Sequence, residues 1–464
     1  MTRPFRVAIV GAGPAGIYAG NILRTKAAER GITISIDLFE TLPAPYGLIR
    51  YGVAPDHPRI KGIVTSLHEM LDEGSIRLLG NVAVGTDITI GELGEFFHAV
   101  ILATGSQRDA PLELPGVDLR GSFGAADFVS WYDGHPDVPR DWPLDATEVA
   151  VLGNGNVALD VARVLAKHPS DILATDIPDN VYRSLAASPV TDVHVFGRRG
   201  PADVKFTPIE LRELGEVPGV DIVLDDADFF ETEPVGEQRA VGNQAKVMAR
   251  IIQTWRDRTS TGATRRLHLH FWHRPVAILG EAGVEGIRFE RTVPDGDGGI
   301  RGTDVFHEYP VQAVYRAVGY QGSPVLDVPF DERAGVIPND GGRVLDDGGL
   351  PISGLYATGW IKRGPVGLIG HTKSDATETI DKLLEDYDDI SIAERPDDEA
   401  VTAFLAARGT QYTTWAGWQA LDAHERALGS AFDGAVERER IKVVPRDEQV
   451  AISSAGALVG SDHG

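Results

Sequence analysis

The chain has 464 residues, a length that predicts two or three domains. Its residues are 42% hydrophobic and 24% charged, a composition typical of globular proteins. It contains no cysteine, which excludes disulfides, a dithiol redox centre and cysteine-ligated iron–sulfur clusters. Its net charge of −24 argues against nucleic-acid binding, and no segment approaches the roughly 18 consecutive apolar residues that span a bilayer.

Short β-branched runs alternate with helical patterns along most of the chain. The runs "RVAIVG", "ISIDLFE", "AVILATG", "EVAVLG" and "VHVFG" predict strands, and "AGIYAGNILRTKAAER" and "VALDVARVLAKH" predict helices between them. This alternation predicts an α/β fold with parallel sheets covered by helices. The first strand begins within a few residues of Met1, leaving no room for a signal or transit peptide, so we expect a cytoplasmic protein.

The first glycine motif, "GAGPAG", follows a predicted strand and opens a predicted helix. Gly11, Gly13 and Gly16 form a G-x-G-x-x-G arrangement, whose bare backbone lets a pyrophosphate approach the positive end of the helix. The next strand ends in Glu40, placed to accept a hydrogen bond from a ribose hydroxyl. A carboxylate there would repel a 2′-phosphate, so this site is predicted to bind FAD or NAD rather than NADP.

The second glycine motif repeats this logic with a different ending. Gly153 and Gly155 follow the strand "EVAVL", and alanine replaces the third glycine, as the motif allows. The partner strand "DVHVFG" is followed by Arg198 and Arg199 instead of an acid. Guanidinium groups match a 2′-phosphate, whereas the alternative is a solvated charge pair at a strand end. The motif therefore predicts an NADP site, and the two sites together predict electron transfer from NADPH to bound FAD.

Three later segments, "AVILATGS", "AVYRAVGY" and "GLYATGW", look like strands that return the chain between the two nucleotide-binding domains. We therefore expect two Rossmann-like domains, with the NADP domain inserted into the FAD domain and a short helical extension at the C-terminus. The expected divisions are 1–106 and 321–390 for the FAD domain, 107–320 for the NADP domain and 391–464 for the extension. The extension is predicted to cover the FAD domain, to mediate dimerisation or to contact a partner.

Six segments together carry a family resemblance over about residues 4–388: "GAGPAG", "LPAPYGLIRYGVAPDHPRIK", "GNGNVALDVAR", "GRRGP", "IELREL" and "GWIKRGPVGLIG". The chain resembles the adrenodoxin reductase-like NADPH–ferredoxin reductases, particularly those of actinobacteria. The resemblance implies a flavoprotein oxidoreductase that accepts hydride from NADPH onto FAD and passes electrons singly to a ferredoxin-type iron–sulfur protein. The alternatives are another acceptor (a quinone, oxygen or an organic substrate) and a non-enzymatic role as a dinucleotide sensor.

The resemblance also implies the residues that contact the cofactors. For FAD these are Ala15, Glu40, Leu48, Val84, Trp360, Gly367, Leu368 and Ile369. For NADP these are Asn154, Asn156, Val157, Arg198, Arg199, Glu210 and Gly367. Trp360 is alternatively an ordinary core aromatic. A cofactor-contacting arginine of some relatives falls on Ala110 here, and Arg108 is the candidate substitute.

Three residues are candidates for handling protons. His57 lies in the turn "APDHPRIK", which the family places near the flavin, and imidazole suits proton transfer near neutral pH. Its alternative role is a hydrogen bond that fixes the turn. Asp160 and Glu213 match acids of the family, and Asp160 alternatively braces its helix. Hydride transfer itself requires positioning rather than an acid or base.

A basic stretch interrupts this acidic chain between residues 246 and 274, where seven Lys and Arg residues accompany a single acid, Asp257. Such a stretch favours docking of an acidic ferredoxin, on Arg250, Arg256 and Arg258 in particular. The alternative is a solvated helix face. No metal site is predicted.

Overall fold

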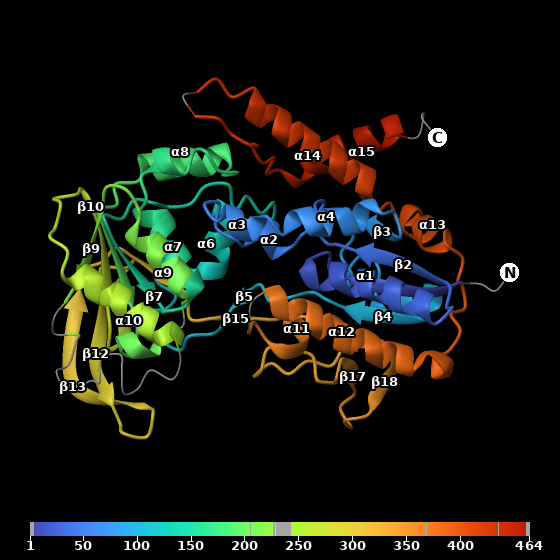
Figure 1. The fold of residues 1–464 in the computed structure, drawn as a ribbon, viewed down its shortest axis with the longest axis horizontal. Coiled ribbons are helices and arrows are strands. Elements are labelled where there is room, and N and C mark those ends of the chain that lie inside the picture. The colour runs from blue at the N-terminus through green and yellow to red at the C-terminus, as the bar shows by residue number, and fades with distance from the viewer. Residues whose placement is uncertain are drawn as a thin grey trace. The chain divides into compact units, whose positions relative to one another are not determined.

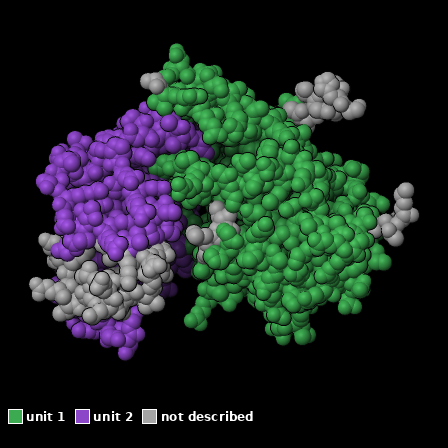
Figure 2. Space-filling model, in the orientation of Figure 1, with its two compact units in different colours: residues 1–108, 133–137, 320–464 green, residues 109–132, 138–319 purple. Residues whose placement is uncertain are grey.

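The computed structural model describes the chain except at residues 1–3, 205, 226–227, 229–242, 367–368, 435 and 461–464. The chain divides into two compact units, which Figure 2 shows in green and purple. Unit 1 comprises residues 1–108, 133–137 and 320–464, and unit 2 comprises residues 109–132 and 138–319. Each unit is built on a largely parallel sheet, so the predicted α/β class with two Rossmann-like units is confirmed.

The sheet of unit 1 has the strand order β16-β17-β18-β4-β1-β2-β3 (Figure 1). β1 runs parallel to both neighbours, with Ile9 opposite Leu38 on one side and Ile101 on the other. All six residues of β1 are buried, as expected for a parallel strand covered on both faces. The strands are β1 (Phe5–Val10), β2 (Ile34–Phe39), β3 (Ile76–Leu79), β4 (Ala99–Leu102), β16 (Asn339–Asp340), β17 (Arg343–Leu345) and β18 (Pro351–Ala357).

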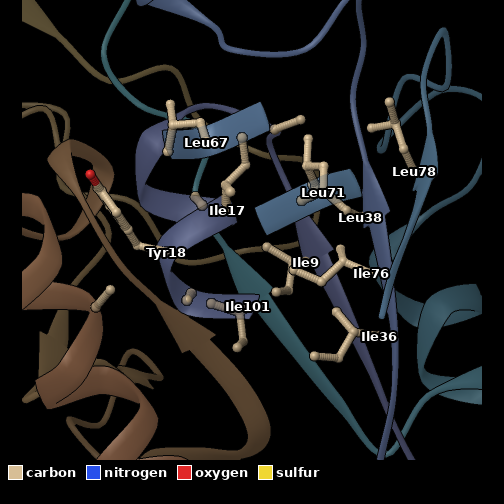
Figure 3. Close-up of a cluster of buried hydrophobic side chains, with 14 of the residues drawn as sticks. Ile9, Ile17, Tyr18, Ile36, Leu38, Leu67, Leu71, Ile76, Leu78 and Ile101 are labelled. Atoms are coloured by element: carbon tan, nitrogen blue, oxygen red, sulfur yellow. The ribbon is translucent and has the colours of Figure 1, made fainter. Parts of the chain in front are cut away.

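Side chains alternate between two hydrophobic clusters on the two faces of this sheet. On one face, Ile9 and Leu38 meet Ile17 and Leu67 from the helices α1 and α4 (Figure 3). On the other face, Val10 joins residues of α5 and α13. Each buried aliphatic side chain contributes about 1.5–3 kcal/mol, so this double layer is what holds the strand ends, and the loops after them, in place.

Among the described residues, unit 1 has five helices of at least nine residues, which are α1, α4, α12, α14 and α15, and several shorter ones. They are α1 (Pro14–Glu29), α2 (Leu48–Tyr51), α3 (Pro58–Lys61), α4 (Val64–Asp72), α5 (Ile90–Phe96), α11 (Trp360–Arg363), α12 (Ile369–Glu385), α13 (Ala400–Ala407), α14 (Trp415–Ser430) and α15 (Arg446–Gly460). α1 and α12 lie side by side (Figure 1). Among the residues with a described position, no helix is both long and apolar enough to cross a bilayer.

Unit 2 has a six-stranded sheet, in the order β6-β14-β7-β8-β10-β9, and a separate antiparallel sheet, β11-β12-β13. Phe196 of the first sheet stacks on Phe289 of the second, with ring centroids 4.0 Å apart. The strands are β6 (Ser122–Gly124), β7 (Glu148–Leu152), β8 (Asp192–Phe196), β9 (Val220–Leu224), β10 (Arg265–His270), β11 (His273–Leu279), β12 (Gly286–Pro294), β13 (Ile300–Tyr309) and β14 (Ala313–Arg316). The helices are α6 (Ala125–Tyr132), α7 (Asn156–Ala166), α8 (Asp179–Ala187), α9 (Pro208–Gly215) and α10 (Asn243–Arg256).

Candidate functional site

The first glycine loop lies between β1 and α1 in unit 1. A side chain at each of its three glycines would meet different surroundings. Gly11 has a φ of +109°, and a Cβ there would lie 2.5 Å from the carbonyl oxygen of Ala103. A Cβ at Gly16 would lie 2.0 Å from the carbonyl oxygen of Gly11. At Gly13, by contrast, the nearest atom to a Cβ would be Gly47 Cα at 4.0 Å. The fold itself therefore requires Gly11 and Gly16, whereas the space at Gly13 is left for a ligand.

Glu40 lies at the end of β2 and holds this loop. Its Oε2 accepts a hydrogen bond from the backbone N–H of Ala12 at 2.8 Å, and its Oε1 accepts one from Leu42 at 3.1 Å. Burial raises the pKa of Glu40, and these N–H donors oppose that rise. Each carboxylate oxygen keeps a further lone pair, so the group can still accept a bond from a ribose hydroxyl.

Two more turns bring predicted FAD contacts to the same loop. Gly47 has a φ of +49°, and a Cβ there would lie 3.2 Å from Gly13 Cα, so the start of α2, at Leu48, is next to the loop. Gly359 has a φ of +76°, and its missing Cβ would lie 2.6 Å from the Cβ of Ala15. Trp360 follows directly and is half-buried. Unit 1 therefore gathers four of the predicted residues: Gly13, Ala15, Leu48 and Trp360.

The remaining predicted FAD contacts are Val84 and the segment 367–369. Val84 forms an isolated bridge with Ile88 and packs against the second core cluster. Gly367 and Leu368 lie outside the described residues. Ile369 is the first residue of α12, and its side chain lies outside the described part.

Sequence reasoning missed the residue that fastens the Trp360 turn. Asp375, on α12, is buried. Its Oδ2 accepts hydrogen bonds from Thr358 Oγ1 at 3.1 Å and from the backbone N–H of Gly359 at 2.5 Å. Its Oδ1 lies 3.2 Å from Lys362 Nζ. An acid within a helix carries no sequence signal for such a role, because its partners are side chains and backbone outside its helix.

Two further residues missed by sequence reasoning are the hydroxyls that follow β4. Within the described part of the chain, the side-chain oxygens of Thr104 and Ser106 are buried without a hydrogen-bond partner. Leaving a buried hydroxyl unpaired costs about 1–3 kcal/mol, so these groups fit a polar ligand bound beside them. Together with the open space at Gly13, they indicate that the residues of unit 1 fit a dinucleotide.

The second glycine loop, between β7 and α7 in unit 2, has the same division of roles. Gly153 has a φ of +133°, and a Cβ there would lie 2.2 Å from the carbonyl oxygen of Ala317. A Cβ at Gly155 would meet nothing within 4 Å. Ala158, in place of the third glycine, is fully buried. The fold thus requires the first glycine, and the second again leaves room beside a helix N-terminus.

Hydrogen bonds connect the side chains around this loop. Asn156 Oδ1 accepts from the backbone N–H of Thr207 at 3.1 Å, and its Nδ2 donates to Glu210 Oε1 at 3.4 Å. The amide of Asn154 lies against Gly197, where a Cβ would be 3.2 Å from its Nδ2. Asn154 therefore lies close to the end of β8, and Asn156 and Glu210 contact each other. Val157 follows Asn156 in the first turn of α7.

Arg198 and Arg199 follow β8, which runs parallel to β7 with Phe196 opposite Leu152. The pair therefore leaves the sheet at the same edge as the glycine loop. The carbonyl oxygen of Arg198 accepts from Thr292 Oγ1 at 2.8 Å, and that of Arg199 accepts from the N–H of Trp272 at 3.2 Å. The Arg198 side chain is exposed, while Arg199 donates to the Gly298 carbonyl at 2.9 Å.

The candidate proton-handling residues lie on three different elements. His57 is 4% exposed, and its backbone forms the turn: its N–H donates to Ala54, and its carbonyl accepts from Lys61. On α7, Asp160 forms an ion pair with Arg163 at 2.9 Å, an arrangement that fits its alternative role as a brace. Glu213 lies on α9 and is half-buried.

The remaining predicted residues are arginines. Arg108 is exposed and donates to the carbonyl oxygen of Gly322 at 3.0 Å. Arg250 and Arg256 are exposed on α10, and Arg258, just beyond it, is also exposed and donates to the Gly215 carbonyl at 2.9 Å. The proposed docking residues therefore lie on or directly after one helix of unit 2.

The two kinds of glycine should respond differently to the same substitution. Gly13→Ala and Gly155→Ala are expected to leave the fold intact and to weaken binding of the ligand of their own unit by about tenfold or more, since an intruding methyl group costs about 1–3 kcal/mol. Gly11→Ala and Gly153→Ala are expected to destabilise the fold, because their Cβ atoms would overlap backbone carbonyls. Unfolding in urea and titration with each dinucleotide separate the two outcomes. Equal loss of stability in all four variants would contradict this assignment.

Comparison with known proteins agrees with this geometry. The family model described as pyridine nucleotide-disulphide oxidoreductase matches residues 5–193. The chain is 40% identical to NADPH-ferredoxin reductase FprA of Mycobacterium tuberculosis, over 97% of this chain and 99% of that protein. It is 36% identical to mitochondrial NADPH:adrenodoxin oxidoreductase of Homo sapiens, over 91% and 88% respectively. The solved structure of Mycobacterium tuberculosis FprA in complex with NADPH matches with a TM-score of 0.91 at 39% identity, covering 97% of this chain and all of that one.

Proposed function

Since this chain belongs to the adrenodoxin reductase-like NADPH–ferredoxin reductases, we propose how its own residues serve that activity. The protein is a flavoprotein oxidoreductase that uses FAD and NADPH and has a ferredoxin-type iron–sulfur partner. The observation that carries this function is 40% identity to a named NADPH-ferredoxin reductase over nearly the full length of both chains. The matching family is described as pyridine nucleotide-disulphide oxidoreductases, but a chain without cysteine has no dithiol for disulphide chemistry.

We propose that unit 1 binds FAD and that unit 2 binds NADPH. When bound, FAD supplies the chemistry of accepting a hydride from NADPH and releasing electrons one at a time. In unit 1, Glu40 accepts a hydrogen bond from the adenosine ribose, and the bare backbone at Gly13 lets the pyrophosphate approach α1. Thr104 and Ser106 donate their otherwise unpaired hydroxyls to polar atoms of the cofactor. Ala15, Leu48, Val84, Trp360 and the segment 367–369 complete the contacts.

In unit 2, the N-terminus of α7 and the space at Gly155 receive the pyrophosphate of NADPH. Asn154, Asn156 and Glu210 orient the nucleotide through hydrogen bonds. Arg198 and Arg199 bind the 2′-phosphate and so select NADPH over NADH. The chain carries no acidic residue at these two positions, which is why the second site differs from the first.

We propose His57 as the group that holds a proton near the flavin, with Asp160 and Glu213 as supporting acids. The backbone of His57 forms the hydrogen bonds of its turn with Ala54 and Lys61. His57→Gln is expected to slow acceptor reduction and shift its pH profile, while Asp160→Asn mainly loosens α7. If rapid-mixing kinetics and pH profiles of both variants match the unmodified protein, His57 and Asp160 are structural.

The activity is tested by absorbance and by a coupled assay. The purified protein is expected to show a bound flavin spectrum that NADPH bleaches, and to reduce cytochrome c rapidly only when a ferredoxin is added. A colourless protein that gains no chromophore with added FAD would overturn the cofactor assignment. Equal rates with and without ferredoxin, but rapid turnover with a quinone or oxygen, would favour the alternative acceptors.

Docking on Arg250, Arg256 and Arg258 predicts a salt-dependent reaction. At 0.1 M salt, attraction between exposed charges more than about 10 Å apart is largely screened, so ferredoxin-linked activity should fall as salt rises. Replacing each arginine with glutamine should raise the KM for ferredoxin a few-fold with kcat nearly unchanged. Arg301→Gln, an exposed arginine of β13 in the same unit, is the matched control. A flat salt dependence, or equal effects of the control, would contradict this docking surface.

A further inference from the structure

Three histidines meet on one face of the unit 2 sheet, apart from the residues used above. His194 lies on β8 and His268 and His270 on the neighbouring strand β10, with His268 directly opposite His194. Residues two apart on a strand point to the same face, so all three imidazoles project together. One nitrogen from each ring lies within 4.8 Å of the others.

The hydrogen bonds of these rings leave one nitrogen of each pointing to the others. His194 Nδ1 lies 3.0 Å from His270 Nε2. His268 Nε2 lies 2.7 Å from Asp192 Oδ1, so its Nδ1 is the nitrogen that this contact leaves for a metal ion. His194 Nε2 lies 3.7 Å from Glu148 Oε2. Metal-bound histidines usually give their second N–H to a carboxylate, and His268 has such a carboxylate in place, in Asp192.

The surroundings shield the rings from solvent. The side chains of His194 and His268 are 10% and 17% exposed. Asp192 is held in turn by Arg266, whose Nε and Nη2 donate to it at 2.6 and 2.7 Å.

We propose that His194, His268 and His270 form a site for a zinc-type divalent ion. Three imidazoles with a water in the fourth position are a ligand set that Zn²⁺ accepts, and the Asp192 carboxylate behind His268 fixes the tautomer of that ring. Zn–N bonds of about 2.0–2.1 Å put tetrahedral nitrogens about 3.4 Å apart, which lies between the 3.0 Å of the closest pair and the 4.8 Å limit of the set.

Binding requires a defined rearrangement. The rings of His194 and His268 are stacked, with an interplanar angle of 14° and centroids 4.2 Å apart, so at least one ring must rotate for both lone pairs to reach one ion. The bond between His194 and His270 must also break. If His194 is the donor, its proton moves from Nδ1 to Nε2, facing Glu148, through exchange with solvent. The three ligands stay neutral and no net proton is released.

The site ties β8 to β10 and uses none of the residues assigned to the cofactors, so we assign the ion a structural role. β8 ends at Phe196, two residues before Arg198. An ion bound to His194 of β8 and to the two histidines of β10 would therefore stiffen the strand that leads to the arginine pair. The sequence motif "HLH" at 268–270 was the available signal. It does not reveal the third ligand, because His194 lies on another strand far away in the chain.

The test uses the FAD-loaded protein after chelator treatment. Titration with ZnCl₂ by calorimetry is expected to show one ion per chain and a higher melting temperature. CoCl₂ is expected to give the intense visible absorption of a tetrahedral Co²⁺ centre, a readout that needs no variant. His194→Gln, His268→Gln and His270→Gln should each weaken Zn²⁺ binding by at least about tenfold.

His307→Gln provides the control, since His307 is exposed on β13 of the same unit. It should bind Zn²⁺ as the unmodified protein does. The proposal is overturned if the unmodified protein binds no stoichiometric Zn²⁺ and gives no tetrahedral Co²⁺ spectrum. It is equally overturned if binding survives in the three variants, each checked for retained flavin, or falls as much in the control.

Discussion

Replacing Arg198 and Arg199 together by alanine is expected to raise the KM for NADPH by about 10²-fold or more, because charge-assisted hydrogen bonds contribute about 1.5–3 kcal/mol each. NADH has no 2′-phosphate, so its KM should change little. The two coenzymes share every other contact, and their ratio therefore isolates this one group. Steady-state kinetics with ferricyanide as acceptor measure both values without involving the ferredoxin.

The single variants refine this expectation. Arg198 is exposed and faces solvent, whereas Arg199 also donates to the Gly298 carbonyl in the turn between β12 and β13. Arg199→Ala is therefore expected to loosen that turn as well, and Arg198→Ala to change only the coenzyme preference. Arg301→Ala serves as the control for a general loss of positive charge from unit 2. A double variant that keeps its preference for NADPH would refute the assignment.

The second large effect is expected in the C-terminal segment, residues 391–464. Glu425→Ala should destabilise unit 1 by about 3–5 kcal/mol and release FAD. Glu425 is fully buried on α14, and its two oxygens accept from Nη2 and Nη1 of Arg50 at 2.5 and 3.0 Å. Its Oε1 also accepts from the N–H of Val443 at 3.0 Å. Removing the carboxylate leaves the Arg50 guanidinium charged and buried without this partner.

The loss of the Glu425 carboxylate is expected to weaken FAD binding because Arg50 lies on α2, two residues from the predicted FAD contact Leu48. Lys442 Nζ donates to the carbonyl oxygen of Arg50 at 2.9 Å. The C-terminal segment therefore binds both the backbone and the side chain of Arg50. Urea unfolding and the fraction of FAD retained after gel filtration measure the two consequences. Titration with added FAD then shows whether the remaining folded protein binds it more weakly.

The matched control lies on the same helix. Arg426 is 48% exposed and pairs with Asp422 and Glu439, so Arg426→Ala should change the free energy of unfolding by no more than about 1 kcal/mol. Truncation of the whole segment would not make this distinction, since it also removes the buried Trp418. If Glu425→Ala unfolds at the same urea concentration as Arg426→Ala and keeps its flavin, the segment is not part of the FAD site.

The C-terminal segment also shows where sequence reasoning reached its limit. From the sequence, covering the FAD domain, dimerisation and partner contact were equally open. In the structure, α14 and the residues after it belong to unit 1, and the segment is joined to it by buried charges: Glu425 to Arg50 and Lys442 to the Asp133 carbonyl at 3.1 Å. Partners so far apart in the chain leave no periodic pattern from which they could be paired.

The sequence by itself determined the α/β class, the two glycine loops and the contrast between Glu40 and the Arg198–Arg199 pair. These features are legible because strand, loop and helix are consecutive, and their chemistry depends on a few neighbouring residues. Only the tertiary structure showed which glycines the fold requires and which leave space, and that Thr104 and Ser106 lack partners. It alone brought Asp375 to the Trp360 turn and three histidines to one sheet face, because side chains from separate elements become neighbours only when the sheets and helices pack.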